Sequence, residues 1–205
     1  MLGRKGFRSI VLRCDNRALI PRPETEMLVE IALELAPRRV LDVGTGTGAI
    51  ALAIADELPD CEVIATDTSP EALSLASENL DALGLADKVT LESGSVPAAS
   101  GEFDLLVSNL PYVSEAESQG LEPDLREFEP RQALVSGPSG LEAFEGLLAG
   151  PSGISALRDS PESIALEVGE GQARAVAAML ESAGHHRIEV RPDLAGIERA
   201  VLARR

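Results

Sequence analysis

The segment Val40-Leu41-Asp42-Val43-Gly44-Thr45-Gly46-Thr47-Gly48 decides the fold of this chain. It starts as a short buried strand and ends in a glycine-rich turn, which opens a helix predicted over residues 49–58. Ligands of open α/β sheets bind at the carboxyl ends of strands, beside turns of this kind. The segment therefore predicts a strand–turn–helix unit of an α/β domain, with a ligand site at the turn.

Strands and helices alternate along the rest of the chain. Helices are predicted over residues 25–37, 49–58, 70–83, 141–148 and 172–183, and strands over 40–43, 63–66, 89–91, 103–108, 163–168, 187–190 and 200–202. This alternation indicates a doubly wound, seven-stranded, mostly parallel sheet with helices on both faces. The last two strands lie too close in sequence for a helical crossover, so we expect an antiparallel hairpin at one edge.

The first residues differ from this pattern. Two extended stretches, 8–13 and 17–20, predict a hairpin around Asp15-Asn16, and Pro21 and Pro23 exclude regular pairing or helix before Glu24. We therefore divide the chain into a hairpin and linker segment, 1–23, and a main domain, 24–205. Pro, Gly and Ser cluster over 114–139, which predicts a long loop with room for short elements.

Composition narrows the possible partners of the 205-residue chain. Its formal net charge is −16, from 18 Lys and Arg against 34 Asp and Glu, and nucleic-acid binding depends on Lys and Arg that neutralise phosphates. We therefore disfavour nucleic acid as a partner. No apolar run reaches the roughly 18 residues that span a bilayer, so we expect no membrane partner. The isolated Cys14 and Cys61 suit a reducing cytoplasm, and we expect His185-His186 to lie in a solvated loop without a metal.

The glycine turn alone leaves two kinds of ligand open. With Ala49 it satisfies the dinucleotide pattern Gly-x-Gly-x-x-Ala, but Gly44, Gly46 and Gly48 also form the Asp-x-Gly-x-Gly-x-Gly pattern of methyltransferases. Asp42 could reach a cationic amino group, whereas it would repel a pyrophosphate. Asp67, at the end of the next strand, could accept both ribose hydroxyls of either ligand. The methyl donor S-adenosylmethionine is thus favoured over a nicotinamide cofactor.

A second segment, Asn109-Leu110-Pro111-Tyr112, decides between them. It follows a predicted strand and so lies at the same edge of the sheet as the glycine turn. An amide or aromatic amine is a poor nucleophile, because its lone pair is delocalised. The Asn109 side-chain oxygen and the Leu110 carbonyl can hold its two N–H groups, and Pro111 keeps Leu110 extended. Tyr112 can stack on the planar group, so this segment predicts methyl transfer to a planar nitrogen.

From about Leu2 to Arg205, the chain resembles the HemK/PrmC family of release-factor glutamine methyltransferases. Besides the two motifs above, the resemblance is carried by Leu19-Ile20-Pro21-Arg22-Pro23-Glu24-Thr25-Glu26, by Leu121-Glu122-Pro123, by Glu129-Pro130-Arg131 with Ala133-Leu134, and by Pro192-Asp193-Leu194-Ala195-Gly196-Ile197-Glu198-Arg199. It implies the class I S-adenosylmethionine-dependent methyltransferase fold. It also implies methylation of the glutamine amide in the Gly-Gly-Gln motif of peptide-chain release factors.

The family's site residues carry over by position. Donor contacts fall on Gly44, Thr45, Gly46, Thr47, Gly48 and Asp67, and contacts to the target glutamine fall on Asn109, Leu110, Pro111 and Tyr112, with Asn109 also beside the donor. Near the adenine we assign Ser95, although Ser93-Gly94-Ser95 lacks the acidic or aromatic residue usual there. The family usually has Asn-Pro-Pro-Tyr, and the Leu110 form also occurs in ribosomal RNA adenine dimethylases.

The family also carries an N-terminal helical domain that docks the release factor, and this chain begins at the hairpin that follows it. We expect either a truncated reading or a short member of the family. Two other functions remain open: methylation of an adenine or guanine amine in RNA or DNA, and donor binding without transferase activity.

Overall fold

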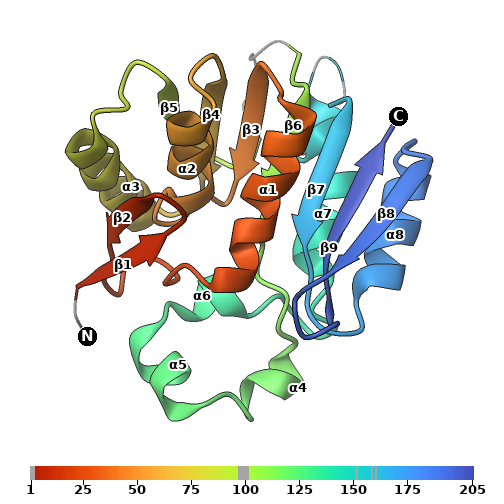
Figure 1. Ribbon diagram of the computed structural model, residues 1–205. Coiled ribbons are helices and arrows are strands. Elements are labelled where there is room, and N and C mark those ends of the chain that lie inside the picture. The colour runs from red at the N-terminus through yellow and green to blue at the C-terminus, as the bar shows by residue number, and fades with distance from the viewer. Residues whose placement is uncertain (1–2, 97–101, 151, 158, 160) are drawn as a thin grey trace.

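A computed structural model describes residues 3–96, 102–150, 152–157, 159 and 161–205. Its main feature is a seven-stranded sheet in the order β5-β4-β3-β6-β7-β9-β8 (Figure 1). The strands are β3 (Arg39–Val43), β4 (Glu62–Asp67), β5 (Val89–Ser93), β6 (Leu105–Ser108), β7 (Ser163–Glu167), β8 (Arg187–Pro192) and β9 (Glu198–Arg204). The pairs among β3 to β7 are parallel, and β9 runs antiparallel to both of its neighbours. The expected seven-stranded, mostly parallel sheet is confirmed.

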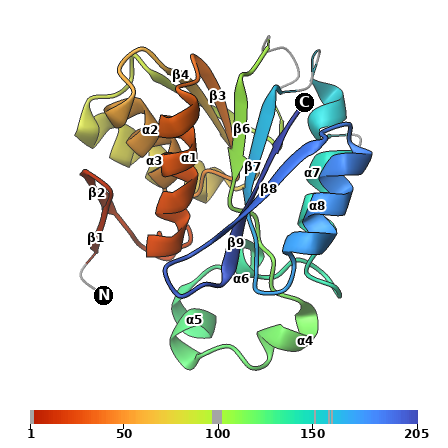
Figure 2. The same ribbon diagram turned by 45° about the vertical axis from the view of Figure 1, so that its right-hand side comes forward.

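Helices cover both faces of the sheet (Figures 1 and 2). The helices α1 (Glu26–Leu35), α2 (Ala49–Glu57) and α3 (Pro70–Leu83) contribute to one hydrophobic cluster, and α7 (Glu142–Ala149) and α8 (Ala173–Ser182) contribute to another on the opposite face. All five helices were predicted at these places, and their ends agree within a few residues. The doubly wound arrangement follows from strands that are apolar on both faces.

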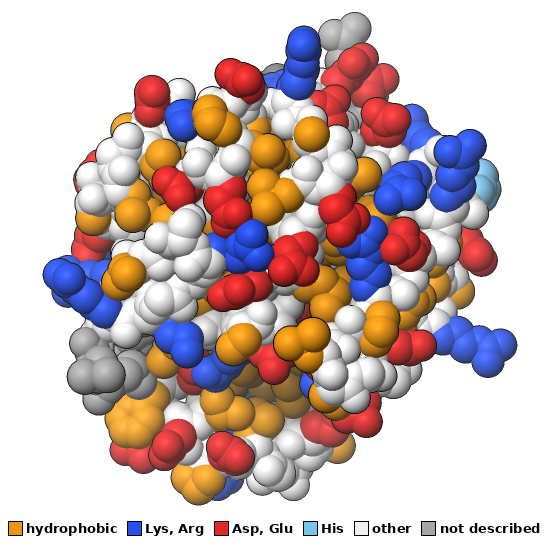
Figure 3. All heavy atoms as spheres, in the orientation of Figure 1, with side chains coloured by type: hydrophobic (Ala, Val, Ile, Leu, Met, Phe, Trp, Pro, Cys, Tyr) orange, Lys and Arg blue, Asp and Glu red, His pale blue; other side chains and the backbone are white. Residues whose placement is uncertain are grey.

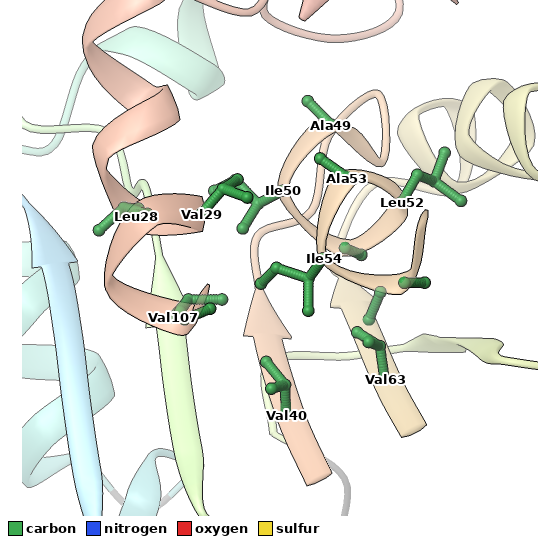
Figure 4. Close-up of a cluster of buried hydrophobic side chains, with 14 of the residues drawn as sticks. Leu28, Val29, Val40, Ala49, Ile50, Leu52, Ala53, Ile54, Val63 and Val107 are labelled. Atoms are coloured by element: carbon green, nitrogen blue, oxygen red, sulfur yellow. The ribbon is translucent and has the colours of Figure 1, made fainter. Parts of the chain in front are cut away.

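Helix α2 anchors the glycine turn because it is buried almost all round. Each residue from Ala49 to Ala55 is buried, as expected of a helix without a polar face. Figure 4 shows Ile50 of α2 facing Val29 of α1, and Ile54 above Val40 of β3. The turn before α2 is therefore held by the core and not by solvent-exposed structure.

The N-terminal hairpin exists, but its predicted position was wrong. It pairs β1 (Arg4–Phe7) with β2 (Ile10–Arg13), so its turn lies at Arg8-Ser9 and not at Asp15-Asn16. Arg8 adopts a left-handed conformation with φ 51°. The carboxylate of Asp15 accepts hydrogen bonds from the backbone N–H and side chain of Arg17, a local turn that replaces strand pairing.

At the carboxyl end of the chain, one expectation is confirmed and one was wrong. The C-terminal strands β8 and β9 form the expected antiparallel hairpin at one edge of the sheet, in which the reversed strand β9 lies between β7 and β8. The His185 side chain is fully buried and its Nε2 lies 3.1 Å from the Pro161 carbonyl oxygen, whereas His186 is exposed. Burial lowers the pKa of His185. The expected solvated loop is therefore wrong for His185, which lies in the core, and only His186 faces solvent just before β8 begins.

The long loop folds into three short helices, α4 (Glu115–Ser118), α5 (Pro123–Phe128) and α6 (Arg131–Leu134). Together with their connections they form the α4–α6 segment, which lies beyond the carboxyl ends of the parallel strands (Figures 1 and 2). Ser114 and Glu117 form a reciprocal capping box that starts α4. Two 3-10 turns, η1 (Pro23–Thr25) and η2 (Ile154–Ala156), complete the elements of the described ranges, and no helix among those residues is long and apolar enough to cross a membrane.

Candidate active site

A cavity of about 490 Å³ lies at the carboxyl ends of β3, β4 and β6. Its walls come from the glycine turn, the end of β4, the residues after β6, the linker before α1, and parts of α6 and α7. Figure 3, which has the orientation of Figure 1, shows a hollow lined by hydrophobic side chains between the sheet and the α4–α6 segment. The volume falls within the range of about 300–1,000 Å³ that is typical of small-molecule sites.

Two of the three glycines in the turn perform different tasks. A Cβ at Gly44 would lie 3.3 Å from Leu110 Cδ2 and 4.0 Å from the Asn109 carbonyl oxygen, so the turn closely approaches the residues after β6. Gly44 also lines the cavity, with φ +77°. Gly48 does not line it; a Cβ there would lie 2.9 Å from Leu52 Cδ1, inside α2. Gly48 therefore permits the start of the helix.

The other assigned donor residues lie around the same space. Thr45, Gly46 and Thr47 line the cavity, as does Ser95, whose carbonyl accepts a 2.7 Å hydrogen bond from the Thr66 hydroxyl. The fold thus brings every assigned donor residue except Gly48 to one cavity.

Asp67 lies on the cavity wall with its carboxylate already oriented. Oδ2 accepts the Gly46 N–H at 2.9 Å, and Oδ1 accepts the Ser69 N–H at 2.9 Å. A carboxylate oxygen can accept about two hydrogen bonds. Each oxygen of Asp67 therefore keeps an acceptor site for one hydroxyl of a vicinal diol.

Asp42 takes a position that differs from its expected contact with the ligand. It is fully buried and is absent from the cavity wall; its Oδ2 accepts the Thr45 hydroxyl at 2.7 Å, and Oδ1 has no partner among the described residues. Burial raises the pKa of Asp42 to about 7, and the nearby charge of Asp67 adds to this rise. Two carboxyl groups beside the turn favour a cationic ligand over a pyrophosphate.

The residues after β6 divide into a cavity-lining group and a supporting residue. Asn109, Leu110 and Pro111 line the cavity, and β6 pairs with β3 so that Ser108 lies opposite Val43. Within the described part of the chain, neither Asn109 Oδ1 nor the Leu110 carbonyl accepts a hydrogen bond. Both acceptors are thus available to a ligand.

Tyr112 lies outside the cavity wall and packs against the hydrophobic cluster of α7 and α8. Its hydroxyl lies 3.5 Å from Glu167 Oε1, and burial raises its pKa to about 12. Its carbonyl accepts the Gln172 amide at 2.9 Å. These contacts fix the direction in which the chain leaves the cavity.

An ion pair between the buried Glu129 and the half-exposed Arg22, which we did not predict, joins two of the motifs that carry the family resemblance. The Glu129 side chain is 3% exposed; its Oε1 accepts from Arg22 at 2.7 Å and its Oε2 from the Ile20 N–H at 3.0 Å. This pair connects the linker before α1 to the residue before Pro130, and both segments line the cavity. The motifs containing Arg22 and Glu129 were visible in the sequence, but their contact was not.

We expect Glu129→Ala to destabilise the fold by about 2–3 kcal/mol, because it leaves the Ile20 N–H and the Arg22 guanidinium without their acceptor. Glu127→Ala is the matched control, since Glu127 is exposed on α5 and should change stability by no more than about 0.5 kcal/mol. Thermal and urea unfolding of both variants measures the difference. Equal stabilities would show that the ion pair does not hold the two segments together.

The cavity suits S-adenosylmethionine in shape and charge. Gly44 leaves room for a ligand to approach the backbone, Asp67 offers two acceptors to a ribose diol, and the carboxyl groups of Asp67 and of the buried Asp42 complement a positive charge. When bound, this group supplies a methyl attached to a positively charged sulfur. The residues present thus fit the donor that the motifs predicted.

Comparisons with known proteins agree with this reading. The Methyltransferase small domain family matches residues 23–122. Release factor glutamine methyltransferases from Cereibacter sphaeroides, Deinococcus radiodurans and Escherichia coli are 42%, 44% and 41% identical to the chain; each alignment covers all of it and 73%, 73% and 74% of the relative.

Among solved structures, a methyltransferase from Pyrococcus furiosus has a TM-score of 0.67 at 16% identity, covering 94% of this chain and 87% of that one. The N-terminal domain of human METTL16 in complex with SAH also has a TM-score of 0.67, at 14% identity, covering 94% and 75%. These likenesses show the class I methyltransferase fold. The identity over the whole chain shows more: this protein belongs to the release factor glutamine methyltransferase family, and its cofactor is S-adenosylmethionine.

Proposed function

We propose that this enzyme transfers a methyl group from S-adenosylmethionine to the side-chain amide nitrogen of the glutamine in the Gly-Gly-Gln motif of peptide-chain release factors. One observation carries the proposal: the glycine turn and Asn109-Leu110-Pro111 face the same cavity, and Gly44 lies so near that a Cβ there would be 3.3 Å from Leu110 Cδ2. The names of the relatives support the choice of substrate.

In the proposed reaction, Asn109 and Leu110 hold the target amide. Its two N–H groups donate to Asn109 Oδ1 and to the Leu110 carbonyl, neither of which accepts a hydrogen bond from another described residue. This grip turns the nitrogen towards the methyl group for in-line displacement. Orientation of this kind can lower a barrier by as much as ~7–11 kcal/mol, and acceptors aimed at the developing positive charge on nitrogen stabilise it further. Pro111 and Tyr112 then set the direction of the gripping segment.

We assign donor binding to Gly44, Thr45, Gly46, Thr47, Asp67 and Ser95. Gly48 supports the turn through α2, and we give it no contact with the donor. Domain boundaries remain as proposed from the sequence, with segment 1–23 before the main domain 24–205. We also place the enzyme in the cytoplasm, since Cys14 and Cys61 are buried free thiols.

Asp67→Ala should weaken S-adenosylmethionine binding by about 10- to 100-fold, because two charge-assisted hydrogen bonds to the ribose are lost. Asp87→Ala, at an exposed turn position, is the control and should bind the donor normally. Isothermal titration calorimetry gives both dissociation constants. An unchanged constant for Asp67→Ala would remove Asp67 from the donor site.

The substrate is tested with tritiated S-adenosylmethionine, a purified release factor and a structured RNA in separate reactions. We expect label in the release factor, and no label when its Gly-Gly-Gln glutamine is replaced by alanine. Acidic and basic side chains are interspersed over the face shown in Figure 3, which supports a protein substrate over a phosphate backbone. Label in RNA alone would replace the proposal with amine methylation of a nucleobase, and donor binding without any label would replace it with a binding function.

A further inference from the structure

One side chain joins three loops behind the Asn109-Leu110-Pro111-Tyr112 segment. Gln172, the half-buried residue that precedes α8, donates from Nε2 to the Tyr112 carbonyl at 2.9 Å and to the Gly140 carbonyl at 3.4 Å. Its Oε1 accepts the Gly169 N–H at 3.0 Å. Tyr112 lies after β6, Gly169 after β7 and Gly140 before α7, so a single amide ties together the connections of three elements.

We propose that Gln172 is a positioning residue for methyl transfer, which sets the direction of the Leu110 carbonyl by fixing Tyr112 two residues further along the chain. This role rests on the proposed grip of Asn109 and Leu110 on the glutamine amide. Gln172 does not line the cavity and needs no contact with the substrate or the donor.

The partners of Gln172 leave its amide a single orientation. A backbone carbonyl only accepts a hydrogen bond, and a backbone N–H only donates one. The NH2 group must therefore face the carbonyls of Tyr112 and Gly140, and the oxygen must face the Gly169 N–H. In the opposite orientation, each of these contacts would place two donors or two acceptors against each other. The side chain is thus fixed by its partners.

Glycines close the space around Tyr112. A Cβ at Gly140 would lie 2.4 Å from the Tyr112 carbonyl oxygen, and a Cβ at Gly169 would lie 3.0 Å from Tyr112 Cδ2 and 2.9 Å from Gln172 Oε1. These distances leave no room for a side chain unless the neighbours move, so glycine at both positions allows the loops to approach. Gln172 therefore acts at a closely packed junction.

The chain between Ser108 and Tyr112 is held at both ends. Ser108 ends β6 within the parallel sheet, and Tyr112 is held by Gln172. Between them, the ring of Pro111 fixes its own φ and restricts Leu110 to extended backbone. Few torsions are left free in this segment, so a shift at Tyr112 turns the Leu110 carbonyl.

A second contact limits the size of the effect. The Val113 N–H donates to the Leu134 carbonyl at 2.9 Å, and this hydrogen bond remains when Gln172 is substituted. A displacement of about 1 Å can lower a reaction rate by about 10²-fold. Because Val113 is still held, we expect a smaller displacement and a loss of about 5- to 20-fold.

The test compares Gln172→Met, which removes both hydrogen-bonding ends, with Gln172→Glu, whose carboxylate accepts from Gly169 but cannot donate to Tyr112. With a purified release factor and tritiated S-adenosylmethionine, the single-turnover rate is divided by the fraction of enzyme that binds the donor in calorimetry. Both variants should lose about 5- to 20-fold in this rate, with an unchanged dissociation constant for the donor. A loss of folded protein alone would lower the bound fraction and leave the corrected rate unchanged. Gln119→Met, at an exposed position, is the matched control and should behave as the original enzyme.

Gly169→Ala gives an independent measurement if the Gln172 variants fold poorly. Gly169 lies outside the left-handed region of the backbone, so the added Cβ strains no torsion and presses on Gln172 and Tyr112. We expect a loss of the same size in the corrected rate. Gly120→Ala is its control, because a Cβ there would lie 3.5 Å from the Glu117 carbonyl oxygen, an ordinary contact.

Unchanged corrected rates in Gln172→Met and Gly169→Ala would overturn the role of Gln172, as would an unchanged rate in Gln172→Glu, which has no donor for Tyr112. Asn109→Ala, measured in the same assay, separates this result from the proposed function. If Asn109→Ala is inactive while the Gln172 and Gly169 variants are normal, only the role of Gln172 fails. If Asn109→Ala is fully active, or if the original enzyme labels no release factor, the proposed function fails and the role of Gln172 fails with it.

Discussion

Asn109→Ala should reduce methyl transfer to a release factor by about 10²- to 10³-fold while leaving S-adenosylmethionine binding nearly unchanged. The reason is that Asn109 Oδ1, which accepts no hydrogen bond within the described ranges, is one of the two acceptors proposed to hold the target amide, and the substitution removes it without disturbing the glycine turn or Asp67. Single-turnover assays with tritiated donor measure the transfer rate, and calorimetry measures the donor affinity. The expected pattern is a loss in the single-turnover transfer rate with a constant dissociation constant for the donor.

Asn16→Ala is the matched control for this experiment. Asn16 is exposed in the turn after β2, so its removal should leave both the rate and the donor affinity unchanged. A loss of donor binding in Asn109→Ala that equals its loss of rate would mean that Asn109 acts on the donor and not on the target amide. Full activity would remove it from the mechanism.

Asp42→Asn should increase the free energy of unfolding at pH 8 by about 2–4 kcal/mol. Asp42 is fully buried, and its pKa is raised from 3.8 to about 7, chiefly by burial. A pKa difference of this size between the folded and unfolded states corresponds to roughly 4 kcal/mol of destabilisation when the carboxyl is ionised. A neutral amide at the same position avoids that cost.

The sign of the pH dependence provides the sharper measurement. Because the folded state binds the Asp42 proton more tightly than the unfolded state, this residue makes the fold more stable as the pH falls through about 7 towards 4. The advantage of the Asn variant should therefore shrink over this range and nearly vanish near pH 4. Urea unfolding at several pH values measures it, with the exposed Asp60→Asn as control. A constant difference across this range would contradict the assigned cause.

Much of the fold followed from local patterns. Ser69 caps α3 and accepts the Ala72 N–H at 3.2 Å, Pro70 begins that helix, and Gly84 ends it in a left-handed conformation, which are the positions that these residue types favour. The hairpin of β1 and β2 was misplaced, because hydrogen bonds between Asp15 and Arg17 compete with strand pairing over so few residues. In so short a segment, small differences in free energy decide between strand pairing and a local turn.

The sequence by itself determined the alternation of buried strands and helices, and with it the edge of the sheet where the glycine turn and Asn109 meet. Periodicity, caps and glycines are local properties, and parallel strands place their carboxyl ends together whatever the details of packing. Only the tertiary structure decided that Asp42 is buried beneath the turn, that Arg22 pairs with Glu129, and that Thr25 contacts Asn109. These contacts join residues far apart in the chain, so their burial and partners depend on how the layers pack.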